Sequence, residues 1–287
     1  MSEGTHPRAD ELDDLTALQL IEVMHAEDLE AVQAMRPELR HLATAIEQIA
    51  ERLRSGGRLR YFGAGTSGLI ARLDAAECPA TFGVAADLVQ AVAVEDAGQE
   101  DDRELGRDAA RRASLTSRDV AVGVSASGRT PFVLGALEAA AGSGALRVAI
   151  SCRRGSAAAS AADLAIEIDT GPEVIAGSTR LKSGTVQKLV LNMLSTAVFT
   201  RLGRTHRGRM VGVKADNAKL KDRATRVVAE IAGASPEEAR STLEAAEGDA
   251  RVAIVMLSRH LDVAEARRQL EAAGGDLRRV QAEVRRP

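Results

Sequence analysis

Five short apolar runs, separated by Ala-rich stretches, occupy residues 59 to 168 and constrain the fold more than any other feature of the chain. Strands that alternate with helices predict a mostly parallel sheet between layers of helices, which is an α/β three-layer sandwich. The runs expected to form strands are Leu59–Phe62, Leu88–Val94, Val120–Val124, Leu146–Ile150 and Leu164–Ile168. Because ligands of such sheets bind beyond the carboxyl ends of the strands, we expect the turns that follow these runs to form the site.

The turn after the first run is rich in glycine and hydroxyl groups. It reads GAGTSG over residues 63–68 and leads into a predicted helix that carries Asp74 and Glu77. A Gly-rich turn at a helix N-terminus directs backbone N–H groups, here together with the Thr66 and Ser67 hydroxyls, at one point, which suits a phosphate. Glu77 lies about two and a half turns further along the helix and is the first carboxylate of interest.

The turn after the third run repeats this arrangement. It reads SASGRT, so that Ser125, Ser127, Arg129 and Thr130 lie in the turn, and Pro131 is placed in the first turn of the next helix. A single turn of this kind is usually no more than a helix cap. Two of them in one sheet indicate a shared phosphate ligand.

The GAGTSG string also fits the dinucleotide pattern G-x-G-x-x-G, so a Rossmann-type nucleotide site is an alternative. The second turn offers serines, a threonine and an arginine, which suit a compact phosphate. No third feature of the sequence marks a nicotinamide partner. We therefore favour the compact phosphate over the dinucleotide.

A third polar patch precedes a long apolar helix. Ser178 and Thr179 are placed where this helix is expected to begin, and Lys182 falls in its first turn. Hydroxyls, N–H groups and a cation at one helix start can share an anion, so these three residues join the candidate site. The apolar positions expected to be buried beyond them are Val186, Leu189, Val190, Met193 and Leu194.

The regions on either side of the α/β segment read as helical. The segment Asp10–Gly57 has apolar residues at helical spacing, and Thr16 with Gln19 forms a capping box, so its helices pack on the sheet or on a partner subunit. From about Asn217 onward, short helices with Ser or Asp caps and Gly stops predict a small all-helical domain. The expected domains are residues 1–57, 58–216 and 217–287.

The composition argues against several classes of protein. The 287 residues include 38 basic and 41 acidic ones, no Trp and one Tyr, so a basic groove with stacking aromatics for nucleic acid is not expected. No apolar run approaches the roughly 20 residues that span a membrane. The N-terminus lacks the apolar core of a signal peptide, and Cys78 and Cys152 lie far apart, which favours a cytoplasmic location. The basic cluster Arg201–Arg209 is interpreted as a solvated loop.

Several strings, taken in order, resemble those of one enzyme family: GAGTSG, LDAAECPATFG, SASGRTPF, GPEVIAGSTRLKSGTVQKLVLNMLST and DNAKL. They look like the N-acetylmuramic acid 6-phosphate etherases, members of the sugar isomerase (SIS) superfamily, over essentially the whole chain. The resemblance implies a SIS-type fold, a homodimer and a small-molecule sugar phosphate as ligand. It also implies cleavage of the D-lactyl ether of N-acetylmuramic acid 6-phosphate, without metal or organic cofactor. Residues 235–262 further resemble a ubiquitin-associated three-helix unit.

The resemblance assigns two catalytic glutamates. The first lies in ECPATFG and is Glu77; the second lies in an acidic string before a helix and is Glu100, with Glu95 as a near competitor. In the open-chain sugar a base removes the C2 proton, the C3 ether leaves once an acid protonates its oxygen, and water then adds to the double bond. Two positioned carboxyl groups can serve as that base and acid. Our hypothesis gives Glu100 the C2 proton and Glu77 the protons of the ether and of water.

The resemblance also gives the hydroxyl residues the phosphate-binding role. The residues expected to hold the phosphate are Ser67, Ser125, Ser127 and Thr130, assisted by Thr66, Ser178 and Thr179. Lys182 or Arg129 would pair with the lactyl carboxylate or with the phosphate. Glu173 is a further acidic candidate or, equally, an exposed loop residue.

The chain departs from the family pattern at several points. Leu69 and Ile70 follow GAGTSG where the family has Arg-Leu, and the segment between Glu77 and Glu100 is shorter and lacks an Ala-Gly-Gly stretch. Two alternatives from the same superfamily therefore stay open. One is a noncatalytic sugar-phosphate regulator of the glucokinase regulatory type, and the other is an aldose–ketose isomerase. The strings ECPATFG and GSTRLKSGT favour the lyase.

Overall fold

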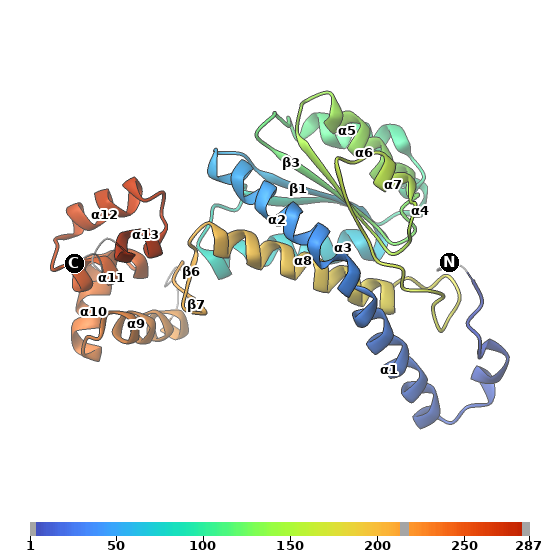
Figure 1. The fold of residues 1–287 in the computed structure, drawn as a ribbon, viewed down its shortest axis with the longest axis horizontal. Coiled ribbons are helices and arrows are strands. Elements are labelled where there is room, and N and C mark those ends of the chain that lie inside the picture. The colour runs from blue at the N-terminus through green and yellow to red at the C-terminus, as the bar shows by residue number, and fades with distance from the viewer. Residues whose placement is uncertain (1–3, 213–217, 283–287) are drawn as a thin grey trace. The chain divides into compact units, whose positions relative to one another are not determined.

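A computed structural model describes residues 4–212 and 218–282 of the chain (Figure 1). The chain divides into two compact units. The first consists of Met1–Ala76 and Asp87–Ser195, and the second of Glu77–Ala86 and Thr196–Pro287. The domain boundary predicted at residues 216 and 217, and the start of the DNAKL string, fall in the segment 213–217, which lies outside the described residues.

The first unit is built on a five-stranded parallel sheet with the strand order β2-β1-β3-β4-β5. The strands are β1 (Leu59–Ala64), β2 (Val89–Val94), β3 (Val120–Ser125), β4 (Leu146–Ser151) and β5 (Leu164–Glu167). Every residue of β1 and β3 is buried, as expected of central strands that are covered on both faces. Each of the predicted runs is a strand, and the prediction of an α/β fold is confirmed.

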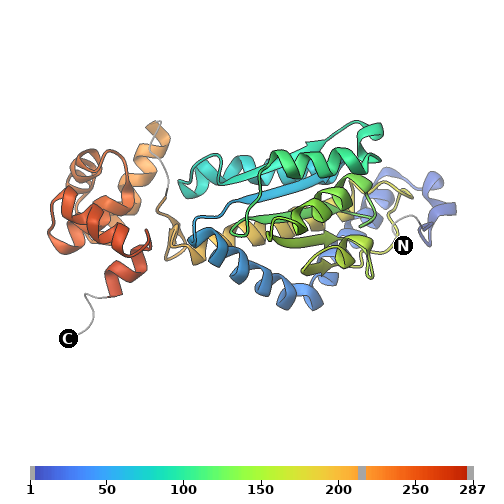
Figure 2. The same ribbon diagram turned by 90° about the horizontal axis from the view of Figure 1, so that it is seen from above.

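Helices cover both faces of this sheet (Figures 1 and 2). One face carries α5 (Arg103–Arg112), α6 (Pro131–Ala141) and α7 (Ala157–Ser160). The other carries α2 (Leu39–Arg54), α3 (Gly65–Phe82) and α8 (Lys182–Arg201). Phe62 and Ala121 of the sheet pack with Phe132 of α6 in one buried cluster, which holds the first layer of helices in place. The short helix α4 (Ala97–Glu100) follows β2.

The N-terminal segment is helical, as predicted. It contains two 3₁₀ helices, Ala9–Asp14 and Arg36–Glu38, and the helices α1 (Ala17–Ala34) and α2. Thr16 caps α1 in the predicted capping box with Gln19. Val23 of α1 packs with Val174 of the loop before α8, and α2 contacts β5. Both helices therefore pack within the first unit.

A buried carboxylate joins the starts of β1 and β3. Asp119 accepts hydrogen bonds from the backbone N–H of Arg58 at 2.7 Å, from Arg58 Nη2 at 3.0 Å and from the backbone N–H of Thr116 at 2.8 Å. Burial alone raises the pKa of the Asp119 carboxyl, but the hydrogen bonds from Arg58 and Thr116 outweigh it and lower that pKa from 3.8 to about 2. The contacts therefore favour the ionised carboxylate.

Replacing Asp119 with asparagine is expected to lower the free energy of unfolding by about 2 kcal/mol at pH 7, since that energy corresponds to the lowered pKa. The pKa is lower in the folded state than in the unfolded state. The contribution is therefore complete above about pH 4 and is lost as the pH falls toward about 2. Urea unfolding of both proteins across this range measures it. A stability difference that does not change with pH would contradict the assignment.

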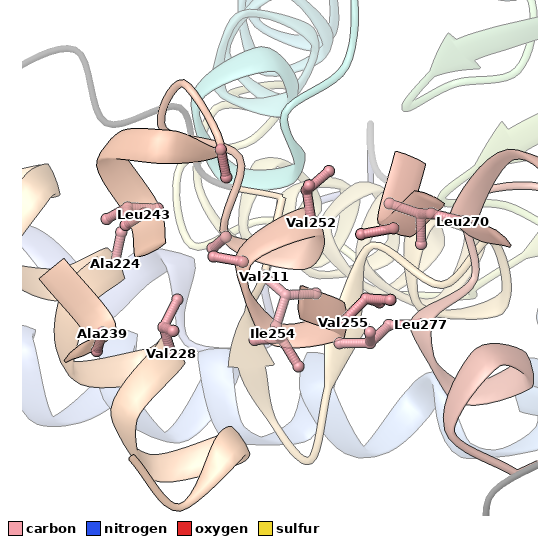
Figure 3. Close-up of a cluster of buried hydrophobic side chains, with 14 of the residues drawn as sticks. Val211, Ala224, Val228, Ala239, Leu243, Val252, Ile254, Val255, Leu270 and Leu277 are labelled. Atoms are coloured by element: carbon pink, nitrogen blue, oxygen red, sulfur yellow. The ribbon is translucent and has the colours of Figure 1, made fainter. Parts of the chain in front are cut away.

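The described part of the second unit consists of helices and one short hairpin. The helices that follow α8 are α9 (Ala218–Ala232), α10 (Pro236–Ala245), α11 (Ala250–Arg259), α12 (Val263–Ala272) and α13 (Leu277–Ala282). Ser235, Asp249 and Asp262 cap α10, α11 and α12 through their side chains, as predicted. Figure 3 shows the buried core between these helices, which includes Val228, Leu243, Ile254, Val255, Leu270 and Leu277.

The hairpin lies in the basic cluster Arg201–Arg209 and contradicts the solvated loop predicted there. Its strands are β6 (Thr205–His206) and β7 (Arg209–Met210), which pair antiparallel. Arg207 and Gly208 form the connection, with φ angles of 48° and 73°. Two successive positive φ angles are typical of a type I′ turn. The sequence did not predict this turn because an arginine rarely adopts a positive φ.

Candidate active site

A pocket of about 250 Å³ lies at the carboxyl ends of β1 and β3. These neighbouring strands lead to helices on opposite faces of the sheet, α3 and α6, so the pocket lies at the topological switch point where such sheets bind ligands. It is lined by Ala64, Gly65, Thr66, Ser67, Glu100, Ala126, Ser127, Thr130, Gly177 and Thr179. The structure thus brings together six of the predicted site residues, from both hydroxyl-rich turns, from α4 and from the loop before α8.

The first turn is tighter than predicted, because α3 already begins at Gly65. Gly65 has a φ angle of 51°, in the left-handed region that favours glycine. A side-chain carbon on Gly63 would lie 2.9 Å from the Cα of Gly68, so the strand and the helix approach closely. Thr66 and Ser67 consequently lie in the first turn of α3, where unpaired N–H groups and the helix dipole favour an anion.

The second turn holds a connected set of hydroxyl groups. Ser125 Oγ lies 2.8 Å from Thr130 Oγ1 and 3.4 Å from Ser127 Oγ, and it accepts a hydrogen bond from Gly128 N at 3.0 Å. The Thr130 hydroxyl does not cap α6; it donates to Glu100 Oε1 at 3.4 Å. Ser125 is buried beneath the pocket and supports the two hydroxyls that line it.

Two glutamates of the acidic segment have different surroundings. Glu100 ends α4 and lines the pocket, and a side-chain carbon on Gly65 would lie 3.8 Å from its Oε2. Glu95 is exposed and accepts a hydrogen bond from Arg72 Nη1 at 2.7 Å. The geometry therefore favours Glu100 over Glu95 as the carboxylate of the pocket.

Glu77 lies on α3, in the part of that helix that belongs to the second compact unit. Its side chain is exposed, and it is not among the residues that line the pocket. Its role as the second catalytic glutamate stays a prediction based on the sequence resemblance. The neighbouring Cys78 is buried.

The start of α8 is neutralised by carboxylates of the protein itself. Glu173 accepts hydrogen bonds from the backbone N–H groups of Lys182 at 3.1 Å and of Ser183 at 3.0 Å. The Lys182 ammonium forms an ion pair with Glu27 of α1. Glu27 Oε1 also lies 3.0 Å from His6 Nε2. Burial raises the pKa of the Glu27 carboxyl, but its contacts with Lys182 and His6 outweigh burial and lower it.

These contacts correct several of the roles predicted for residues of the third polar patch. The alternative that Glu173 is an exposed loop residue is wrong, because its side chain is fully buried and caps α8. Thr179 lines the pocket, whereas Ser178, Lys182 and Arg129 do not. Lys182, one of the two cations expected beside the substrate, therefore pairs with Glu27 instead.

Gln187 of α8 touches the site but was not predicted from the sequence. Ser67 Oγ donates a hydrogen bond to its Oε1 at 2.9 Å. The only indication in the sequence was that Gln187 is the one glutamine in the predicted apolar helix. Val186, Val190 and Leu194 are buried as predicted, and Leu189 is half-buried. Met193 is 41% exposed, so the prediction of its burial is wrong.

No group of three His, Cys, Asp or Glu side chains among the described residues is arranged to hold a metal ion. Within residues 4–212 and 218–282, no helix combines the length and the apolar character needed to cross a bilayer. Burial raises the pKa of the Cys152 thiol to about 12, so this thiol is protonated at neutral pH.

The family model and the fold together identify a SIS domain in this chain. Residues 26–152 match the family model of the SIS domain. A Bacteroides fragilis structure, described as a candidate phosphosugar isomerase involved in capsule formation, is similar with a TM-score of 0.52 and 21% identity, over 70% of this chain and 98% of that one. A candidate sugar-phosphate isomerase of Listeria monocytogenes has a TM-score of 0.50 and 18% identity, over 67% and 94% of the two chains.

Curated relatives specify the family further. Proteins named N-acetylmuramic acid 6-phosphate etherase are 48% identical in Mycolicibacterium smegmatis and 44% identical in Geobacillus thermodenitrificans, each over 92% of both chains. A protein of the same name from Nostoc is 45% identical over 91% of this chain and 88% of its own. The chain belongs to the N-acetylmuramic acid 6-phosphate etherase family, which confirms the resemblance noted in the sequence.

Proposed function

We propose that the protein is a carbon–oxygen lyase that cleaves the D-lactyl ether of N-acetylmuramic acid 6-phosphate, in the recycling of cell-wall amino sugars. The products are N-acetylglucosamine 6-phosphate and D-lactate. The observation that carries the proposal is one pocket in which the Glu100 carboxylate meets the hydroxyl groups of two helix-starting turns. The names of relatives 44% to 48% identical over nearly the whole chain support it.

The phosphate is proposed to lie at the start of α3, among the hydroxyls of Thr66, Ser67, Ser127 and Thr130. The lining of the pocket, as far as the described residues form it, contains no Lys or Arg. Recognition would therefore depend on hydroxyl donors and on the N–H groups of the helix start. The SIS-domain structures of Bacteroides fragilis and Listeria monocytogenes, described as candidate isomerases of phosphorylated sugars, support a sugar phosphate as ligand.

Glu100 is proposed to remove the C2 proton of the open-chain sugar. The electron pair of that C–H bond forms a C2–C3 double bond conjugated with the C1 aldehyde, and the C3–oxygen bond breaks. A second carboxyl group, proposed to be Glu77, protonates the departing lactyl oxygen. Water then adds its hydroxyl to C3 and a proton returns to C2, so that both carboxyl groups regain their initial states. The sum is addition of one water to the substrate, with no net oxidation or reduction.

Release of D-lactate from N-acetylmuramic acid 6-phosphate by the purified full-length protein tests this proposal. We expect one D-lactate for each N-acetylglucosamine 6-phosphate formed. A protein that interconverts aldose and ketose phosphates without forming lactate would be an isomerase. One that binds the substrate and leaves it unchanged would be a regulator. Either result would contradict the lyase.

A homodimer is part of the proposal. Four large apolar side chains of α1 are exposed: Leu18, Ile21, Leu29 and Val32. Their spacing places them on one face of the helix. An exposed apolar stripe of this kind marks a protein contact. Light scattering on the preparation used for the lactate assay gives its mass, and a monomer would contradict the dimer.

A further inference from the structure

Gln187 is a buried polar side chain beside the pocket to which the proposed reaction gives no role. It is 1% exposed, and its Oε1 accepts the hydrogen bond from Ser67 Oγ at 2.9 Å. Its Nε2 is buried and has no hydrogen-bond partner among the described residues. An unpaired buried donor costs on the order of 1–3 kcal/mol, so this orientation of the amide calls for an explanation.

The close approach of α8 to α3 brings Gln187 into contact with Ser67. A side-chain carbon on Gly184 would lie 3.5 Å from Thr66 Cγ2 and 3.4 Å from the backbone oxygen of Thr179. The start of α8 therefore passes directly beside the first turn of α3. Gln187 lies three residues beyond Gly184 on the same face of α8. It thereby reaches Ser67, from which 120 positions separate it in the sequence.

The chemistry of a phosphate sets a requirement on Ser67. In this structure the Ser67 hydroxyl donates its proton to Gln187. Phosphate oxygens are strong acceptors, so a Ser67 that binds the phosphate donates to it and no longer to Gln187. The Ser67 oxygen can then accept a hydrogen bond.

A glutamine can satisfy both arrangements. Its terminal amide carries an acceptor and a donor, and a half turn about its last torsion angle exchanges them. After such a turn Nε2 donates to Ser67 Oγ, which gives the buried donor a partner. Oε1 is then the unpaired atom, and a carbonyl tolerates this more readily than an N–H group.

We propose that Gln187 sets the direction of the Ser67 hydroxyl and so makes Ser67 a donor to the substrate phosphate. Binding reverses the hydrogen bond between the two side chains. Gln187 is a positioning residue, because it acts on the affinity for substrate through Ser67 and touches no reacting atom. This inference rests on the proposed sugar-phosphate function of the pocket.

Two substitutions separate hydrogen-bond direction from side-chain size. In Gln187→Glu the carboxylate only accepts and retains the Ser67 proton, so KM is expected to rise by roughly 10- to 100-fold with kcat within about threefold. Gln187→Met has a similar size but neither donates nor accepts, and is expected to raise KM by about 3- to 10-fold. At lower pH, where the new carboxyl gains a proton it can donate, the KM of Gln187→Glu relative to wild type is expected to fall.

The Ser67→Ala background tests whether Gln187 acts through Ser67. With no hydroxyl to orient, each Gln187 substitution is expected to change KM by less than about twofold in this background. A purely electrostatic effect of the new carboxylate would persist there. Gln48→Glu makes the same chemical change at an exposed position of α2 and is expected to leave KM unchanged.

Two results would overturn the inference. One is a KM within about twofold of wild type in both Gln187 variants, and the other is an effect that persists undiminished in the Ser67→Ala background. Failure of the proposed function looks different. There the wild-type protein neither releases D-lactate nor binds N-acetylglucosamine 6-phosphate, which contradicts both proposals before any variant is compared.

Discussion

Replacing Glu100 with glutamine is expected to lower kcat for D-lactate release by about 10²- to 10⁴-fold. The amide keeps the size of the carboxylate, and its oxygen can still accept the hydrogen bond that Thr130 donates at 3.4 Å. The pocket therefore keeps its shape. The amide cannot take up the C2 proton, so the reaction loses its base. Steady-state kinetics measures the loss, and KM is expected to stay within about threefold of wild type.

Glu95→Gln is the matched control. It makes the same change in the same acidic segment, at an exposed position that pairs with Arg72 at 2.7 Å. An exposed ion pair contributes about 0–1 kcal/mol, so activity and stability are expected to stay close to wild type. An equal loss of kcat in the two variants, or full activity of Glu100→Gln, would remove Glu100 from the role of C2 base.

Solvent deuterium separates the proposed roles of the two glutamates. A base at C2 can exchange the substrate proton with solvent even when the ether bond does not break. Glu77→Gln is therefore expected to stop D-lactate release and to retain exchange at C2, whereas Glu100→Gln is expected to lose both. The opposite pattern would assign the C2 proton to Glu77.

The sheet could be predicted because strands buried on both faces need continuous apolar runs. The exact ends of the strands could not be predicted from this pattern. The strands β3 and β4 each extend by one serine beyond the apolar run, and Ser125 pairs with Ser151 in the ladder. An apolar pattern does not show this, since a hydroxyl residue can continue a ladder. The same extension places the Ser125 hydroxyl beneath the pocket.

The candidate site could be predicted where local sequence determines it, in the turns that follow β1 and β3. Contacts between site residues and residues from distant parts of the chain could not be predicted. Lys182 pairs with Glu27, which is 155 positions away, and no spacing rule connects them. A helix start attracts an anion, as expected for α8, but the anion within reach is the Glu173 carboxylate. The contact between Ser67 and Gln187 depends on helix packing in the same way.

Replacing Asp74 with alanine is expected to lower the free energy of unfolding by about 3–5 kcal/mol. Asp74 is 4% exposed, and its carboxylate accepts hydrogen bonds from Tyr61 Oη at 3.0 Å and from Asn192 Nδ2 and Ser195 Oγ, each at 2.9 Å. Alanine removes the acceptor of all three hydrogen bonds. The loss of this acceptor costs free energy because Tyr61 and Ser195 are buried. Urea unfolding at neutral pH measures the loss.

Asp74→Asn is the control for charge and shape. The amide oxygen can accept from Asn192 and Ser195, and the amide N–H group can donate to the Tyr61 oxygen, so a loss of less than about 1 kcal/mol is expected. Burial raises the pKa of the Asp74 carboxyl, and the hydrogen bonds from Asn192, Ser195 and Tyr61 only partly oppose this. The charge itself therefore opposes folding, and the asparagine variant does not carry it. Equal losses in the two variants would show that the charge, and not the hydrogen bonds, is what stabilises the fold.

The Asp74 contacts also bear on the proposed function, because they join α3 to β1 and to α8. The first turn of α3 presents Ser67 to the pocket, and α8 presents Gln187 to Ser67. A variant that loosens α3 against α8 should therefore lose affinity for substrate as well as stability. At a temperature where Asp74→Ala is still folded, its KM is expected to rise on the order of tenfold, with Asp74→Asn near wild type. Lower stability with an unchanged KM would mean that Asp74 supports the fold but not the geometry of the site.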